Sequence, residues 1–370
     1  MLPIVIPTLR RARLQNAEFI PISDGLLELH FATEPGCTKL PWRSLLLALH
    51  ATPCLRVLVL QNALSRYDTP WEIETDTIDR APLMALEHLT CSGHRGLARA
   101  LLYWIDAPSI HDLHIDADFD MGATLDPFEH FPSQLAAELW VLRNSAQTRL
   151  MMEYARARAN AEDAGQSFTD EVPDSVPVPP LEYLALSIIL DSEVEDSRSA
   201  WPQLITVAAA KDAEGALRGV STHNDFDGPG QSSPRRTFTM RNSFAAFPSD
   251  AMAAFRARLR RDREPCAVNS VVSLLLTAFL AQAGEEDVIS LAFAKGSWLP
   301  TAAQEWSDLL FELPALRTLG LWAPAAPEVL ISLAESLYRD GRELSVRVIA
   351  VRETQAATDE VIDLLPRAIG

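Results

Sequence analysis

One spacing of apolar residues recurs along this chain and constrains its fold more than any other feature. The stretches RLQNA (13–17) and VLQNA (59–63) repeat each other, and in both a leucine stands five positions before the leucine of LQNA: Leu9 before Leu14, and Leu55 before Leu60. A recurring L-x-x-L-x-L phase is typical of a chain built from stacked repeats. Further copies are Leu26, Leu29, Phe31; Leu86, Leu89, Cys91; Ile110, Leu113, Ile115; Leu181, Leu184, Leu186; Val271, Leu274, Leu276; Val288, Leu291, Phe293; Leu316, Leu319, Leu321; and Val346, Ile349, Val351.

The period of these copies indicates what each repeat contains. Successive copies start 29, 31 and 24 residues apart from Leu26 to Ile110, and 28 and 30 residues apart from Val288 to Val346. These spacings lie close to the leucine-rich-repeat period of about 20–29 residues. The last two apolar positions are two residues apart, so in a strand both face the core, and a helix such as that expected over 94–105 returns the chain to the next strand.

The sequence therefore predicts an α/β fold, a leucine-rich-repeat solenoid with a curved parallel sheet on its concave side and helices on its convex side. A generic α/β protein with unrelated strands is the alternative. Long insertions interrupt the repeat at 124–180, which joins a helix candidate to an acidic, proline-rich loop, and at 191–234, around a strand expected over Leu204–Ala210. A further strand is expected from RRTFTMRNSF (235–244). We expect N-terminal repeats over 1–123, the helical insertion over 124–180 and C-terminal repeats over 181–370, in one continuous solenoid.

Charge and cysteine usage restrict the partners and the compartment. The formal net charge of -18 disfavours nucleic acid and anionic membranes, both of which need a basic surface. The longest apolar stretch, Val271 to Ala281, is well short of the roughly 20 residues of a spanning helix. The four cysteines lie far apart in the sequence, which favours reduced thiols. They are Cys37, Cys54, Cys91 and Cys266. We expect an intracellular protein of the cytoplasm or nucleus.

Four stretches carry a resemblance to a known family. They are LPWRSLLLALHATPCLRVLVLQNAL (40–64), APLMALEHLTCSG (81–93), LEYLALS (181–187) and LPALRTLGLW (313–322). Together they resemble the leucine-rich regions of fungal F-box proteins, over most of residues 5–355. The resemblance implies a repeat domain that holds a substrate, and an F-box helix bundle that docks on a cullin-type ubiquitin ligase. No F-box stretch is seen before Leu9, so this chain is either a truncated or mispredicted paralogue or one that works without a ligase.

The segment HDLHIDADFDMG (111–122) raises the question of a metal site. Counting Asp116 as the first ligand of a calcium loop, Met121 stands where glycine is needed and Pro127 where a bidentate glutamate is needed. The repeat phase instead turns Asp112, His114 and Asp116 toward the concave face, and places Asp118 at the turn normally held by asparagine. Asn16 and Asn62 stand one position early for that turn, so a regular asparagine ladder is not expected.

Patterns of a catalytic site are missing, since GxSxG, P-loop and HExxH sequences do not occur. The first hypothesis is a non-catalytic protein-binding scaffold without cofactor or metal, in the manner of an F-box-related substrate receptor. Two alternatives stay open: a metal-dependent enzyme or regulator using His88, Asp112, His114 and Asp116, and a degenerate paralogue with no retained partner. Insertions that cover part of the concave row are also compatible with the sequence. The expected partner-binding residues are Arg11, Arg13, Glu28, His30, Val57, Val59, His88, Thr90, Asp112, His114, Tyr183, Leu275 and Trp322.

Overall fold

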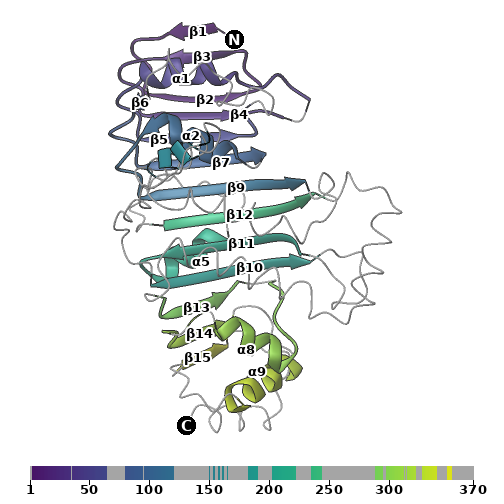
Figure 1. Ribbon diagram of the computed structural model, residues 1–370. Helices are drawn as coiled ribbons and strands as arrows, with labels where there is room; N and C mark the ends of the chain where they lie inside the picture. The colour runs from purple at the N-terminus through teal and green to yellow at the C-terminus, as the bar shows by residue number, and fades with distance from the viewer. Residues whose placement is uncertain are drawn as a thin grey trace, which may run out of the picture. The chain divides into compact units, whose positions relative to one another are not determined.

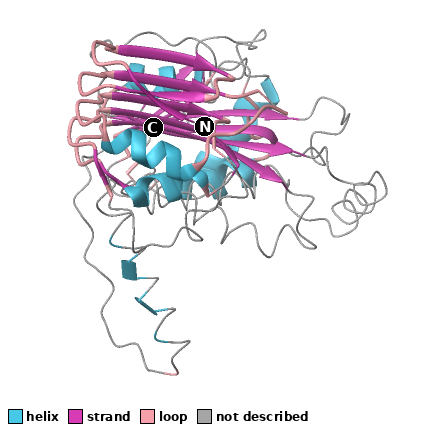
Figure 2. Cartoon of the chain, turned by 90° about the horizontal axis from the view of Figure 1, so that it is seen from above, coloured by secondary structure: helices cyan, strands magenta, loops and turns pink. Residues whose placement is uncertain are grey.

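The computed structural model is of mixed α/β class, as predicted, with mostly parallel strands and few helices (Figures 1 and 2). Its residues form two compact units: unit 1 comprises Met1–Asp118 and Ala137–Pro179, and unit 2 comprises Phe119–Ala136 and Pro180–Gly370. The described residues are 2–34, 36–64, 80–94, 96–120, isolated positions between 150 and 165, 182–190, 202–221, 235–243, 288–294, 297–311, 313, 315–321, 327–339 and 348–351.

The main sheet of unit 1 is parallel, and its register follows the phase seen in the sequence. Its strands, in spatial order, are β2 (Arg11–Gln15), β4 (Glu28–Ala32), β5 (Val57–Gln61), β7 (His88–His94) and β9 (Asp112–Asp120). The middle apolar position of each copy pairs with that of the next, and all of these side chains are buried. They are Ala12, Leu29, Leu58, Leu89 and Leu113.

A turn before each strand repeats one pattern of backbone hydrogen bonds. The first apolar residue of the copy donates its N–H to the carbonyl three residues earlier, over 3.0–3.5 Å; these residues are Leu9, Leu26, Leu55, Leu86, Ile110 and, in unit 2, Leu316. In unit 1 the backbone N–H groups of the next two residues both donate to the same carbonyl oxygen of the preceding copy. The shared carbonyls are those of Arg10, Leu27, Arg56 and Glu87. The backbone thus repeats together with the side-chain phase.

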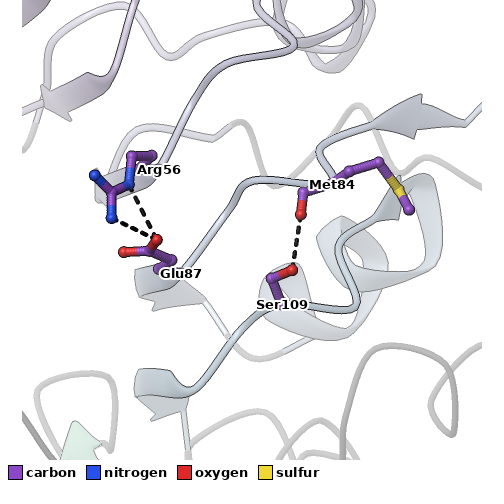
Figure 3. Close-up of polar contacts among 4 residues, drawn as sticks. All are labelled: Arg56, Met84, Glu87 and Ser109. Atoms are coloured by element: carbon purple, nitrogen blue, oxygen red, sulfur yellow. Dashed lines mark hydrogen bonds and ion pairs between the residues drawn. The ribbon is translucent and has the colours of Figure 1, made fainter.

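Side chains also link neighbouring turns of unit 1 (Figure 3). The Arg56 guanidinium donates from Nε and one Nη to the same Glu87 carboxylate oxygen, at 3.0 and 2.6 Å. One turn further on, the Ser109 hydroxyl donates to the Met84 carbonyl oxygen at 2.8 Å. These bonds link neighbouring copies at the start of the strands.

Shorter strands and two helices complete unit 1. Parallel pairs join β1 (Leu2–Val5) to β3 (Phe19–Ile22), and β6 (Ala81–Pro82) to β8 (Ile105–Asp106). Helix α1 (Trp42–His50) follows Pro41, whose fixed φ suits a helix start, and buries Trp42 and Leu45. Helix α2 (Leu97–Trp104) begins after Gly96, with φ of 85°, and its Trp104 packs with Leu46. The helix expected over 94–105 is shorter than predicted because His94 extends β7 and Ile105 begins β8.

Unit 2 contains parallel and antiparallel strands. Strands β15 (Val348–Val351), β14 (Thr318–Leu321), β13 (Ser290–Phe293) and β10 (Tyr183–Leu190) are parallel neighbours, and Leu184, Leu291, Leu319 and Ile349 lie in register. The two strands expected within and after the second interruption, β11 (Pro202–Ala210) and β12 (Arg235–Ser243), are present. Strand β11 pairs antiparallel with β10, and β12 pairs antiparallel with β11, so the prediction of a wholly parallel sheet is wrong there. The predicted copy at Val271–Leu276 lies outside the described residues, and β13 pairs directly with β10.

Helices α8 (Ala303–Phe311) and α9 (Pro327–Arg339) lie beside the C-terminal strands in Figure 1, and α5 (Ala213–Ser221) lies near β10 and β11. Trp306 of α8 packs edge-on against Phe293 of β13, with ring centroids 5.7 Å apart. Both side chains are fully buried, so this contact forms part of the core of unit 2. Within the described part of the chain, no helix has the length and apolar character needed to span a membrane.

Candidate functional site

The polar side chains that alternate with the buried leucines of unit 1 lie in rows across its parallel strands. We call this surface the strand face. Because the strands are in register, residues at one level are neighbours on adjacent strands. The first row is Arg11, Glu28, Val57, His88, Asp112; the second is Arg13, His30, Val59, Thr90, His114; the third is Gln15, Ala32, Gln61, Ser92, Asp116. The first two rows consist entirely of residues predicted to bind a partner.

The strand face is most open to solvent at its β2 edge. Arg11, Arg13 and Gln15 of the first strand are exposed, and the residues of the other strands are mainly half-buried. Val59 is only 4% exposed and Asp116 8% exposed. Val59 is therefore unsuitable as a contact residue, because its short side chain stands between His30 and Thr90 in the middle of the sheet.

An ion pair and a hydrogen bond join neighbouring side chains of the first row. Arg11 Nε lies 3.1 Å from Glu28 Oε1, and His88 Nδ1 lies 3.2 Å from Asp112 Oδ2. The His88 ring also meets the His111 ring edge-on, with centroids 4.9 Å apart. These contacts join side chains on adjacent strands, so the first row presents polar groups that are already paired with each other.

His30 occupies the second row and is surrounded by charge. Burial lowers the pKa of its imidazole first of all, the nearby Arg13 guanidinium lowers it further, and Glu28 acts in the opposite direction. The combined effect keeps His30 neutral at pH 7 more strongly than an ordinary histidine. A ligand that brings negative charge to this position would reverse the effect of Arg13.

The residues proposed for a metal site share the strand face, but their side chains do not form a ligand cluster. His88 and Asp112 are paired, and no group of three or more His, Cys, Asp or Glu side chains that could hold a metal ion occurs in the described ranges. Asp118 was expected at a turn. That expectation is wrong, because β9 continues to Asp120 and pairs Asp118 with His94 inside the sheet.

The asparagines that stand one position early have a structural role at the strand ends. Asn16 and Asn62 adopt left-handed backbone conformations, with φ of 53° and 51°, which asparagine tolerates better than most residues. The Asn16 side-chain oxygen accepts the backbone N–H of Glu34 from the next copy at 2.8 Å. The repeated LQNA sequence was the signal for this role.

Two substitutions of Asn16 separate the contribution of its side-chain hydrogen bond from that of its left-handed backbone. Asn16→Gly keeps the left-handed backbone and loses the hydrogen bond, which we expect to cost about 1 kcal/mol. Asn16→Ala loses both, and should cost about 1–2 kcal/mol more because an alanine is strained at this φ. Urea denaturation of both variants measures the difference. Equal midpoints for the two would contradict a role for the left-handed backbone.

The corresponding face of unit 2 is filled around β10 and β11. Helix α5 packs there against strand positions occupied by small residues, and Tyr183, Leu217 and Ala292 pack against the same cluster. Tyr183 therefore takes part in a helix–sheet contact and is half-buried. Leu275 and Trp322 lie outside the described residues. The buried cluster is Ala185, Ala208, Ala210, Ala216, Val220 and Ala294.

Comparison with known proteins adds no further assignment: the chain matches no protein-family model, no curated protein and no solved structure.

Proposed function

We propose that this protein is a non-catalytic protein-binding scaffold that holds its partner on the strand face of unit 1. The repeat phase, the register and the recurring turn support an architecture of stacked leucine-rich repeats in both units. Such stacks present their strands as an extended recognition surface. The partner contacts then involve the first two rows, except for the buried Val59.

The observation that carries the proposal is the contrast between the two units. In unit 1 the strand face carries exposed or half-buried polar side chains, several of which are joined by cross-strand pairs. In unit 2 the equivalent positions on β10 and β11 include Tyr183 and three alanines, Ala185, Ala208 and Ala210, which pack with α5. A pre-organised surface loses little side-chain entropy when a partner binds, whereas alanines packed under a helix are unavailable. The proposal therefore confines recognition to unit 1.

The resemblance to F-box proteins supports a more specific role within this proposal. The scaffold would act as an F-box-related substrate receptor of a ubiquitin ligase in the cytoplasm or nucleus, and it would engage a ligase adaptor only if an F-box precedes residue 1. The partner held by the strand face would then be the substrate, and the protein itself would carry no catalytic group.

Site-specific photo-crosslinking tests the scaffold function. A photoreactive amino acid at Thr90, in the second row of the strand face, should capture one defined protein in cells of the source organism. The same group at Arg43, an exposed residue of α1, serves as the matched control and should not capture it. With purified components, Thr90→Arg should weaken binding by about tenfold or more, because a misplaced interface charge is costly. Capture from Arg43 alone, or binding unaffected by Thr90→Arg, would contradict the proposed surface.

The ligase role has a separate readout. The captured protein should accumulate in cells that lack this scaffold, and a ligase adaptor subunit should co-purify with a form of the protein that carries an F-box before residue 1. A partner that binds the strand face but keeps its normal lifetime would leave the scaffold in place and reject the receptor role.

A further inference from the structure

Helix α5 lies on the face of unit 2 that corresponds to the strand face of unit 1, beside β10 and β11 (Figure 1). It follows β11 after only two residues, Lys211 and Asp212, and both are exposed. The Asp212 carboxylate accepts the backbone N–H of Gly215 at 2.7 Å, in the first turn of the helix. The start of α5 is therefore tied to the end of β11, whereas the rest of the helix depends on packing against the sheet.

The helix itself is intrinsically weak. Its sequence, AEGALRGVS, has nine residues, two of which are glycines. Isolated helices of fewer than about 12–15 residues are marginal in water even when they are rich in alanine, and glycine is among the poorest helix formers. The helical structure of α5 therefore depends on its contacts with the strands.

These contacts are made largely by small side chains. Among the residues of α5 whose side chains are described, Ala216 and Val220 are buried, and Leu217 is partly buried beside them. An alanine removes much less apolar surface from water than a leucine does, so each alanine contact holds the helix only weakly. The strand residues of the same cluster are also alanines: Ala185, Ala208 and Ala210.

The same face of the sheet carries buried hydroxyl groups. Thr237 of β12 lies directly opposite Ala208 in the antiparallel register, and α5 also contacts β12. The Thr237 side chain is 1% exposed, and its hydroxyl has no hydrogen-bond partner among the described residues. The nearby hydroxyls of Thr206 and Thr239, 3.2 Å apart, pair with each other. Burial of the unpaired Thr237 hydroxyl opposes the docked position of α5, because this hydroxyl would bond to water once the face is uncovered.

We propose that α5 is a reversible cover of unit 2, which undocks from β10, β11 and β12 while the sheet stays folded. The inference goes beyond the proposed function, which uses unit 1 alone, and does not depend on it. Unit 2 then has a closed state, which the structure shows, and an open state in which the alanines and threonine hydroxyls of this face meet solvent. Local opening of this kind is expected where a segment has few buried apolar contacts.

Thiol labelling measures the undocking directly. Ala208 and Ala209 are adjacent residues of β11 and both are 0% exposed, but Ala208 belongs to the cluster with α5 and Ala209 faces the opposite side of the sheet. The probes are the variants Ala208→Cys and Ala209→Cys, labelled with iodoacetamide in native buffer. Mass spectrometry reads the rate at each site separately from the native cysteines.

We expect the thiol introduced by Ala208→Cys to react about tenfold faster or more than that introduced by Ala209→Cys. The first needs only the undocking of α5, whereas the second needs the sheet itself to unfold. Ala210→Cys, also in the cluster with α5, replaces Ala208→Cys if that variant does not fold. Circular dichroism of each variant confirms that the fold is retained.

Thr237→Val tests the contribution of the unpaired hydroxyl. It keeps the shape of the side chain and removes the hydroxyl, so it should favour the closed state. Hydrogen exchange of the α5 backbone amides should then slow by about fivefold or more. Thr237→Ser is the matched control, because it keeps the hydroxyl, and it should not slow this exchange.

Four results would overturn the inference. The first is equal labelling of the thiols on the two sides of β11, and the second is amide protection of α5 as strong as that of β10 and β11. The third is α5 exchange that Thr237→Val does not slow, and the fourth is equal slowing by Thr237→Ser. Rapid exchange of α5 with equal thiol labelling would mean that the helix frays in place without undocking. The Thr90 crosslinking experiment is unaffected by these outcomes, so the scaffold function is accepted or rejected separately.

Discussion

Leu89→Asp is expected to cost several kcal/mol in the free energy of unfolding, because it places a carboxylate without a partner inside the core of unit 1. Leu89 is 1% exposed and pairs in register with Leu58 on one side and Leu113 on the other. Typical domains are stable by only about 5–15 kcal/mol. The variant should therefore show a much lower denaturation midpoint, or an unfolded unit 1 at room temperature. Urea denaturation followed by circular dichroism measures the effect.

Thr90→Asp is the matched control, since it introduces the same side chain one position further along β7 and on the opposite side of the sheet. Thr90 is half-buried on the strand face, and surface changes of this kind usually stay within about 0.5 kcal/mol. Similar losses for the two variants would mean that the faces of β7 have been assigned wrongly.

The register of the parallel strands could be predicted because successive side chains of a strand point to opposite faces of the sheet. Only two assignments of the residues to the two faces are then possible. Once Leu58, Leu89 and Leu113 are placed toward the core, every intervening residue of those strands must face the other way. The turn leucines fix where each strand begins, so neighbouring copies align without further information. For the same reason, ten of the predicted contact residues fall into two adjacent rows.

The covering of Tyr183 could not be predicted, because it depends on a contact between segments far apart in the sequence. Tyr183 follows the repeat phase, and its position predicts an open strand face. Helix α5 comes from the interrupting region, and its residues pack in the same cluster as Tyr183. The alanines at 185, 208 and 210 permit this close approach, but alanine is also common on open surfaces and in helices. Only the pairing of β10 with β11 brings these small residues together.

The antiparallel pairing of β10 with β11 has a more local cause. Only residues 191–201 separate β10 from β11, whereas a parallel connection needs a crossover of about a dozen residues or more. The alternating pattern of 235–244 indicated a strand, but not its partner. The prediction for Asp118 was wrong for a different reason. It assumed the turn position of an idealised repeat, whereas β7 and β9 are both longer than that repeat allows.

Trp306→Ala is expected to cost about 3–5 kcal/mol, the range found when a buried aromatic side chain is truncated and leaves a cavity. Trp306 is 0% exposed, and its ring packs edge-on against Phe293 at 5.7 Å. The indole therefore joins α8 to β13, and its loss removes contacts on both elements. Hydrogen exchange should show reduced protection in β13 and β14, which the side chains of this core support.

Phe311→Ala on the same helix is the control for this truncation, because it removes another large aromatic side chain that is 61% exposed. It should change the free energy of unfolding by about 0.5 kcal/mol or less. Both variants place alanine in α8, so the change in helix propensity is similar in the two. The difference between their free energies of unfolding therefore reports the effect of burial. If Phe311→Ala were the more damaging change, α8 would have to present its other side to the strands, and the apolar phase of Leu291 and Phe293 could no longer define the core of unit 2.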